Sequence, residues 1–537
     1  MNSLFIILFA IAIFVIAYIF YGGWLCKKWG IDPKRETPSH TKEDGIDYVP
    51  ASKGVVLGHH FASIAGAGPI TGPIAAAMFG WVPVLLWIII GSIFFGGVHD
   101  FGALIASLRH NGNSIGEIIE KNIGRRGKKL FGIFAWLTLI LVVAAFLNIV
   151  ASTFAATPQA ATASLLFMVV AVVFGFSVYR RKMNLIISSV VGIALLGVCI
   201  WVGMMFPLVL TVKTWMFILL AYIFLASVTP VWILLQPRDY LNSFLLYAMI
   251  GGALLGMFIA VPRMTEVPAF TAFNINGSLM FPILFVTVAC GAISGFHSLV
   301  GSGTTSKMID KEQDAKVVGY GGMLIEGVLA VIALVAIGAV GMQKGGAIPT
   351  FSIGVGTFMS KIGIPMEVGV PFVALAISAF ALTSLDTATR LARFVFQEFF
   401  MEAANEEKSK VAATLSNMYV ATSISVVIGG IVGFTDWKTI WPIFGSANQL
   451  LSAIALLAIG AWLAQTGREN KMVKIPMVFM FLVTLTALVI LAKNNIASGN
   501  YLLVFFAVVL FVLAIVLIKE SYHILFGKRE QLIQEPA

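Results

Sequence analysis

Long apolar runs recur from one end of this sequence to the other, and they constrain the fold more than any other feature. A bilayer core about 30 Å thick needs about 20 residues of apolar α-helix to cross it. The chain supplies such runs repeatedly: 59% of its 537 residues are hydrophobic and only 11% are charged. An ordinary globular domain is about a quarter charged, so no water-soluble core could bury these segments. The sequence therefore predicts an all-α, polytopic membrane protein whose main solvent is the lipid bilayer.

We expect fifteen transmembrane helices, near residues 3–25, 54–80, 82–106, 130–153, 161–178, 184–206, 214–236, 242–262, 280–305, 317–341, 367–389, 411–433, 439–464, 473–492 and 499–518. One alternate set of loops holds 29 of the 35 Lys and Arg residues, and the other set holds six. Because basic residues resist translocation, the N-terminus is expected outside and the C-terminus in the cytoplasm. The net charge of +10 then reflects loops that face anionic lipid rather than nucleic acid.

A segment rich in glycine and proline interrupts the second predicted span. Residues 55–80 read VVLGHHFASIAGAGPITGPIAAAMFG, in which Pro69 and Pro73 combine with Gly58, Gly66, Gly68 and Gly72. Proline removes a backbone donor and clashes with the preceding turn, and glycine weakens a helix further. Backbone that is unpaired at membrane depth is tolerated only beside protein or a water-filled cavity, so the interruption indicates a substrate site. A proline kink packed against neighbouring helices is the alternative.

A second interruption is expected in residues 226–238, ASVTPVWILLQPR, which contain Pro230 and Pro237. It lies five spans after the first and runs in the opposite direction. Because an odd number of spans ends on the opposite side of the membrane, a second copy of a five-helix repeat must be inverted, as in many secondary transporters. We therefore expect a 5 + 5 inverted repeat with one extra N-terminal helix and about four C-terminal helices. The expected units are an N-terminal helix and loop (1–53), two repeats (54–206 and 214–389), accessory helices (411–518) and a cytoplasmic tail (519–537).

The first interruption is expected to bind an anion. The half-helix that starts near Pro69 presents its positive N-terminus there, which suits a carboxylate. The second interruption would complete the pocket. The predicted substrate-binding residues are Ser63, Ala65, Gly66, Ala67, Gly68, Thr71, Thr229, Trp232 and Gln236.

Six ionisable residues fall within or near the ends of predicted spans, where such side chains are costly and are functional candidates: His59, His60, His99, Asp100, His297 and Asp386. They could carry a coupling proton or form a gate, because imidazole titrates near neutral pH. They could instead hold helices together through hydrogen bonds. Metal binding is a third interpretation, although adjacent His59 and His60 point about 100° apart on a helix. Glu326 and Glu367 are further carboxylates to which the sequence assigns no role.

Residues 290–306, CGAISGFHSLVGSGTTS, form a third glycine-rich element with clustered hydroxyl groups. Ser298, Thr304 and Thr305 could coordinate a cation, or could bond back to carbonyls of their own helix. We expect no cofactor, with H⁺ favoured over Na⁺ as the coupling ion. The three cysteines, Cys26, Cys199 and Cys290, are isolated and lack metal-ligand spacing.

Three segments carry a family resemblance: YVPASKGVVLGHHFASIAGAGPITGPI (48–74), PVWILLQPRDYLN (230–242) and FHSLVGSGTTSK (296–307). They resemble the carbon starvation protein A family, which is similar in turn to the amino acid, polyamine and organocation superfamily with its leucine-transporter fold. The resemblance implies a bacterial inner-membrane symporter, induced when carbon is scarce, that takes up peptides or pyruvate.

The expected function is therefore proton-driven uptake of a small carboxylate-bearing nutrient, and not catalysis. The small-molecule substrate and the lipid bilayer are the expected partners. A sodium-coupled transporter and a channel are alternatives. Saturable counterflow would exclude the channel, because counterflow requires an occluded site and a channel has a continuous pore. An intramembrane metalloenzyme, suggested by the histidines, is a further alternative.

Overall fold

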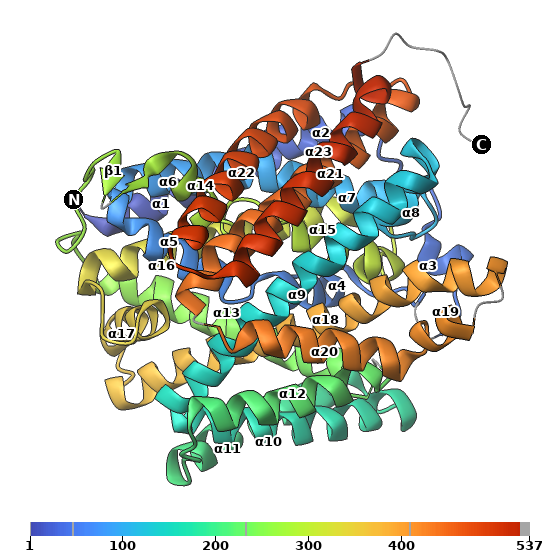
Figure 1. Ribbon diagram of the computed structural model, residues 1–537. Coiled ribbons are helices and arrows are strands. Elements are labelled where there is room, and N and C mark those ends of the chain that lie inside the picture. The colour runs from blue at the N-terminus through green and yellow to red at the C-terminus, as the bar shows by residue number, and fades with distance from the viewer. Residues whose placement is uncertain are drawn as a thin grey trace.

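Most of the described chain is helical (Figure 1). The computed structural model describes residues 2–45, 48–230, 233–275, 277–407, 410–435 and 437–526. Within these residues eleven helical segments are long and apolar enough to cross a bilayer, and one bent pair of helices raises the number to twelve. The eleven are Ser3–Trp29, Trp81–Arg109, Arg125–Ala156, Pro158–Val178, Leu185–Met205, Pro237–Ala260, Lys316–Val340, Met366–Met401, Thr439–Gln465, Lys471–Ala497 and Tyr501–Tyr522. The chain is thus a multi-pass membrane protein.

Most spans are single long helices. These are α9 (Arg125–Ala156), α10 (Pro158–Gly175), α11 (Leu185–Met205), α13 (Leu235–Ala260), α16 (Gly322–Val340), α18 (Met366–Glu407), α21 (Trp437–Gln465), α22 (Lys471–Ala497) and α23 (Tyr501–Phe526). Two spans contain a short π-helical turn, between α1 (Ser3–Ile16) and α2 (Gly22–Trp29) and between α6 (Trp81–Ile90) and α7 (Gly97–Arg109). The short elements are α3 (Pro38–Thr41), α8 (Ile115–Ile123), α17 (Ala347–Ser360), α19 (Lys410–Leu415) and the antiparallel strands β1 (Asn274–Ile275) and β2 (Ser278–Leu279).

The fifteen predicted spans are not all confirmed, because three of the predicted runs are shortened or divided. Helix α12 (Val212–Val228) ends two residues before Pro230, which cannot continue the helical hydrogen bonding. Helix α20 (Met418–Gly433) begins only after Asn417, whose side-chain oxygen accepts hydrogen bonds from the first turn. The third run, 280–305, is divided into two helices.

The interruption predicted in the second span is confirmed. Helix α4 (Lys53–Ile64) and helix α5 (Gly68–Ala76) are separated by residues 65–67 and are bent by 47°. Pro69 lies in the first turn of α5. The N–H groups of a first turn have no partner within the helix, so the N–H that proline lacks is not needed there. We call residues 65–67 the first break.

The interruption predicted at 226–238 differs from the expectation, because it separates two helices and does not divide one span. Helix α12 ends at Val228 and α13 begins at Leu235. Pro237 lies in the first turn of α13, a position that tolerates proline, so the helix continues through it to Ala260. The charged pair that follows Pro237 is therefore part of a helix.

The second divided span lies in α14 (Met280–Thr287) and α15 (Gly295–Gly303), with residues 288–294, the second break, between them. Polar side chains from distant helices bond to its backbone. Trp87 Nε1 donates to the Val288 carbonyl at 3.2 Å, and the Ser92 hydroxyl donates to the Gly291 carbonyl at 3.1 Å. Just after the break, Asn448 Oδ1 accepts from the Phe296 amide of α15 at 2.9 Å. Because buried backbone groups must be paired, these contacts permit a non-helical segment here.

The start of α5, next to the first break, lies against the second break and the end of α14. A methyl group on Gly68 would lie 2.4 Å from the Cys290 sulfur, and one on Gly72 would lie 2.7 Å from the Thr287 carbonyl oxygen. Both distances are shorter than van der Waals contact, so only glycine allows this approach of the two chains. Interrupted backbone from two distant parts of the sequence thus meets in the interior of the protein.

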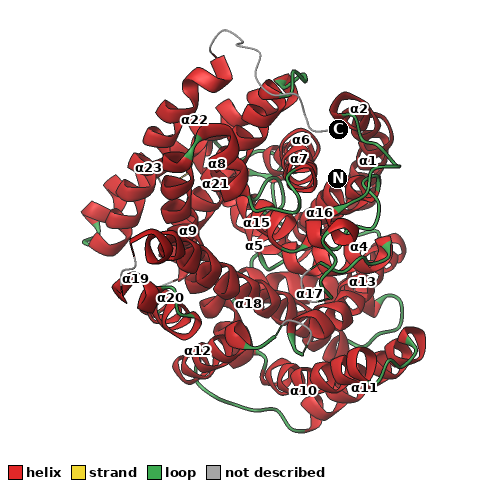
Figure 2. Ribbon diagram, turned by 90° about the vertical axis from the view of Figure 1, so that its right-hand side faces the viewer, coloured by secondary structure: helices red, strands yellow, loops and turns green. Residues whose placement is uncertain are grey.

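The two longest helices, α9 and α18, pack along each other at the centre of the bundle (Figure 2). Helices α12 and α20 each contact both of them. Helices α22 and α23 lie beyond α21 on one side, and the α10–α11 hairpin lies at the opposite side (Figure 2). This frame surrounds the two breaks.

Candidate substrate and coupling site

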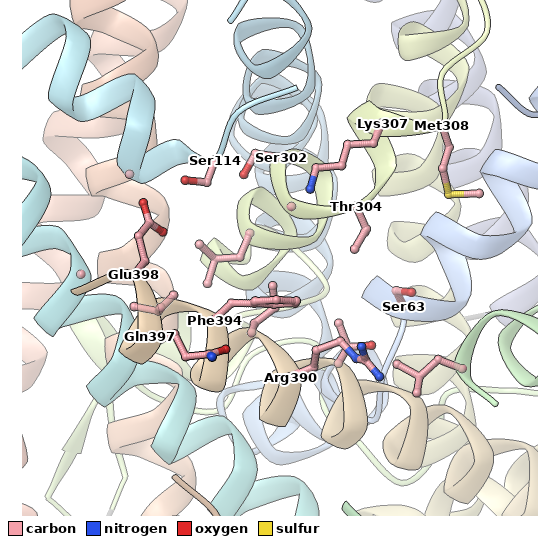
Figure 3. A pocket seen from close by; sticks show the side chains of 18 of the residues that line it. Ser63, Ser114, Ser302, Thr304, Lys307, Met308, Arg390, Phe394, Gln397 and Glu398 are labelled. Atoms are coloured by element: carbon pink, nitrogen blue, oxygen red, sulfur yellow. The ribbon is translucent and has the colours of Figure 1, made fainter. Parts of the chain in front are cut away.

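A cavity of about 850 Å³ leads from the ends of several helices to α4. One wall is formed by α18, which contributes Arg390 and Phe394 (Figure 3). Ser302, Thr304 and Lys307, in α15 and the turn after it, lie on another side. The cavity reaches His59 and Ser63 in the last two turns of α4, so it ends next to the first break.

Of the predicted substrate-binding residues, Ser63 lines this cavity. Its hydroxyl donates to the His59 carbonyl at 2.9 Å. The others of the first group are buried at and just after the first break and do not line the cavity: Ala65, Gly66, Ala67, Gly68 and Thr71.

The first break retains unused donors. The amides of Ala65 and Gly66 donate to the Phe61 and Ile64 carbonyls at 2.9 and 2.8 Å. The amides of Ala67 and Gly68 make no hydrogen bond with any described residue, and the Thr71 hydroxyl also has no partner there. These donors at the start of α5 are suited to an anionic group.

The second predicted group lies between α12 and α13 in the sequence, and the structure describes only part of it. Thr229 caps the end of α12, and its carbonyl accepts a hydrogen bond from the Arg390 guanidinium. Trp232 lies outside the described residues, and the side chain of Gln236 does as well. Only Thr229 can therefore be placed, next to a residue of the cavity wall.

Three of the six ionisable candidates, His99, Asp100 and His297, form a single buried network with Glu326. His99 Nδ1 lies 2.7 Å from Asp100 Oδ1, and His297 Nδ1 lies 2.8 Å from Asp100 Oδ2. The other ring nitrogen of His297 lies 3.5 Å from Glu326 Oε2. All four side chains are fully buried. We call these residues, from α7, α15 and α16, the histidine network.

A second buried network lies around Arg238, at the start of α13. Its guanidinium donates to Asp386 of α18, and to Asp239 at 2.9 Å. The Tyr222 hydroxyl of α12 donates to Asp386 at 2.6 Å. We call these four residues the arginine network. It ties α12, α13 and α18 together, and Asp239 lines the cavity beside His59.

His59 and His60 belong to different surroundings, as their 100° separation predicts. His59 Nδ1 lies 4.0 Å from Asp239 Oδ2, whereas His60 Nδ1 lies 2.8 Å from the Thr305 hydroxyl. Of the hydroxyls proposed for a cation, Ser298 donates to the Gly295 carbonyl at 2.7 Å and Thr304 to the Val300 carbonyl at 2.9 Å. Both bond back to their own helix, and Thr304 also lines the cavity.

Sequence reasoning missed Arg238, Asp239, Tyr222 and Arg390, and gave Glu326 no role. A signal existed for two of them, because the Arg-Asp pair follows Pro237 inside an otherwise apolar region. Arg390 follows Asp386 by one helical turn and so lies on the same face of α18. Nothing in the sequence distinguishes Glu326 from a carboxylate that serves only to pack α16.

Comparison with known proteins gives consistent results. The family model described as carbon starvation protein CstA matches residues 2–344 and 338–487. The peptide transporter CstA of Bacillus subtilis is 33% identical over 515 residues, covering 86% of this chain and 85% of that protein. The pyruvate/proton symporter BtsT of Escherichia coli is 31% identical over 563 residues, covering 85% and 76%.

A solved structure shares the fold. The manganese transporter of Eremococcus coleocola, in complex with an aromatic bis-isothiourea substituted compound, superposes with a TM-score of 0.53 at 11% sequence identity. The likeness covers 90% of this chain and 99% of that one. The relatives and this structure are transporters and not enzymes, so the metalloenzyme alternative has no support from them.

Proposed function

Since this chain belongs to the carbon starvation protein CstA family, we propose that it takes up small carboxylate-bearing nutrients, peptides or pyruvate, across a bacterial inner membrane. It is a multi-pass membrane transporter. The observation that carries the proposal is the interrupted backbone of α4 and α5, which lies directly beyond a cavity large enough for such solutes. A transporter needs backbone that can bind its substrate at membrane depth. A proline kink packed against neighbouring helices would need no cavity beside it.

The carboxylate of the substrate binds at the start of α5. The amides of Ala67 and Gly68 and the Thr71 hydroxyl are the donors without partners in the described chain, and the helix N-terminus is positive. Ser63 and the backbone of Ala65 and Gly66 form the entrance from the cavity. Because this region lies behind the cavity floor, the substrate reaches it when the two breaks move apart.

The fold is built from two inverted repeats of five spans. The contact between the two breaks supports α14–α15 as the counterpart of α4–α5, in place of the segment 229–236 that the sequence suggested. The first repeat then comprises α4–α5, α6–α7, α9, α12 and α13, with the α10–α11 hairpin inserted. The second comprises α14–α15, α16, α18, α20 and α21. The mutual packing of α9, α12, α18 and α20 fits this pairing.

The cavity opens to the cytoplasm, with the N-terminus outside and the C-terminus inside. Lys128, Lys129, Arg180 and Lys307 line the cavity, and these residues belong to the basic set of loops. Basic loops stay on the cytoplasmic side. The described state is therefore inward-facing.

Uptake is coupled to protons, and the histidine network carries them. Its four buried titratable groups form a continuous chain of short contacts from His99 to Glu326. His59, His60 and Asp386 are the further candidates for coupling or gating. Sodium coupling is the second candidate, through Ser298, Thr304 and Thr305, but two of these hydroxyls already donate to helix carbonyls. The name of the E. coli relative, a pyruvate/proton symporter, favours protons.

Counterflow in proteoliposomes tests the proposal. Vesicles loaded with unlabelled dialanine or pyruvate should accumulate the labelled compound transiently, and empty liposomes should not. Thr71→Val should slow exchange, because it removes a donor at the start of α5, whereas Ser164→Ala on α10 should leave it unchanged. Absence of exchange with every peptide and with pyruvate would refute the proposal. Imposed proton and sodium gradients then identify the coupling ion.

A further inference from the structure

Asp239 lines the cavity and has one carboxylate oxygen without a hydrogen-bond partner in the described chain. The side chain is 1% exposed and belongs to the cavity lining. Oδ1 accepts from Arg238 at 2.9 Å, whereas Oδ2 has no hydrogen bond within the described chain. His59 Nδ1 lies 4.0 Å from Oδ2, and it too has no hydrogen-bond partner within the described chain. Buried polar atoms are rarely left in this state, so the pair indicates a binding position.

The charges around Asp239 favour a cation. The Arg238 guanidinium is shared between two carboxylates, those of Asp239 and Asp386. The Tyr222 hydroxyl supplies a hydrogen bond but no charge. Arg390 of α18, which also lines the cavity, donates to the Ala226 and Thr229 carbonyls at the end of α12. A buried carboxylate that shares its counter-ion is stabilised by a further cationic group.

The geometry suits an ammonium group. A nitrogen at about 2.8 Å from each of two atoms can bridge them when they lie 4.0 Å apart. An ammonium group offers three donors, and Asp239 Oδ2 and His59 Nδ1 can each accept one. The remaining donor would point into the cavity.

We infer that Asp239 and His59 bind the terminal ammonium group of the substrate, so that this chain carries short peptides in preference to pyruvate, which has no such group. The inference rests on the proposed function, in which the substrate carboxylate binds at the first break. About six residues of α4 separate His59 from that break, which corresponds to about 9 Å along the helix. An extended dipeptide spans about 7 Å and a tripeptide about 10 Å. The two sites are thus spaced for peptides of two or three residues.

Competition against labelled dialanine in counterflow tests this inference with the full-length protein. The competitors are dialanine, trialanine, N-acetyl-dialanine and pyruvate. N-acetylation removes the ammonium charge and should weaken competition about 10–100-fold, the range expected for a lost charged hydrogen bond. Asp239→Asn should abolish the difference between dialanine and its acetylated form. Glu398→Gln, which neutralises another carboxylate of the same cavity, should preserve it.

Two outcomes would overturn the inference while the proposed function stands. One is wild-type protein that exchanges N-acetyl-dialanine or pyruvate as well as dialanine, a result that needs no variant. The other is an Asp239→Asn protein that still discriminates between the free and the acetylated peptide. Exchange of none of the compounds by the wild type would refute the proposed function, and the inference with it.

Discussion

Replacing Gly68 by alanine should disrupt the contact between the two breaks. The added methyl group would lie 2.4 Å from the Cys290 sulfur and 2.6 Å from its Cβ. Ordinary contact between such atoms is about 3.5–4.0 Å, so one chain must move by more than 1 Å. Overpacking of this kind typically costs about 1–3 kcal/mol. We expect Gly68→Ala to lower the apparent melting temperature of the detergent-solubilised protein and to slow counterflow.

A second substitution tests the physical reason. Cys290→Gly removes both clashing atoms, so the double variant should recover most of the melting temperature and the exchange rate. Cys290→Ala keeps the Cβ at 2.6 Å and should restore much less. A coupling free energy within about 0.5–3 kcal/mol is expected for two residues in direct contact. A Gly68→Ala protein as stable and active as wild type, or a double variant no better than Gly68→Ala, would refute the reasoning.

Three further substitutions test the buried networks. Glu326→Gln removes the titratable end of the histidine network. It should abolish uptake driven by a proton gradient and leave counterflow exchange intact. Equal loss of both activities would contradict the proton role of this network. Arg238→Met should destabilise the protein by about 3–5 kcal/mol, since it leaves buried carboxylates without a counter-ion, and adding Asp386→Leu should recover part of that loss in thermal unfolding. Asn448→Ala leaves the Phe296 amide without its acceptor and should cost about 1–3 kcal/mol, which a melting curve would detect.

The first break could be predicted from sequence because its cause is local. Pro69, Pro73 and the glycines between them weaken helical hydrogen bonding whatever surrounds them. Residues 288–294 carry a weaker signal, because they contain one glycine, Gly291, and no proline. The second break is held by Trp87 and Asn448, which lie more than 150 residues away along the chain. Contacts of this kind exist only once the fold has formed, so the pairing of the two breaks could not be read from the sequence.

The histidine network was partly predictable for a similar reason. The depth of His99, Asp100 and His297 follows from their distance to the helix ends, and equal depth is a condition for contact. Depth does not determine which face of a helix points toward a neighbouring helix. The sequence therefore could not show that Glu326 of α16 faces His297. The arginine network was missed for a different reason. The sequence reading ended a span at Gln236, which placed Arg238 in a loop, whereas the structure has it in the first turn of α13.

The length of α18 has a mechanical consequence. Its 42 residues form one continuous helix of about 63 Å, roughly twice the thickness of the hydrocarbon core. Glu398 lies 12 residues beyond Asp386, about 18 Å along this rod, and its carboxylate is 3.6 Å from Lys128 Nζ at the start of α9. A swing of about 10° pivoting at Asp386 displaces Glu398 by about 3 Å, enough to separate it from Lys128. Because Lys128 and Glu398 both line the cavity, such a swing would change its width between α9 and α18.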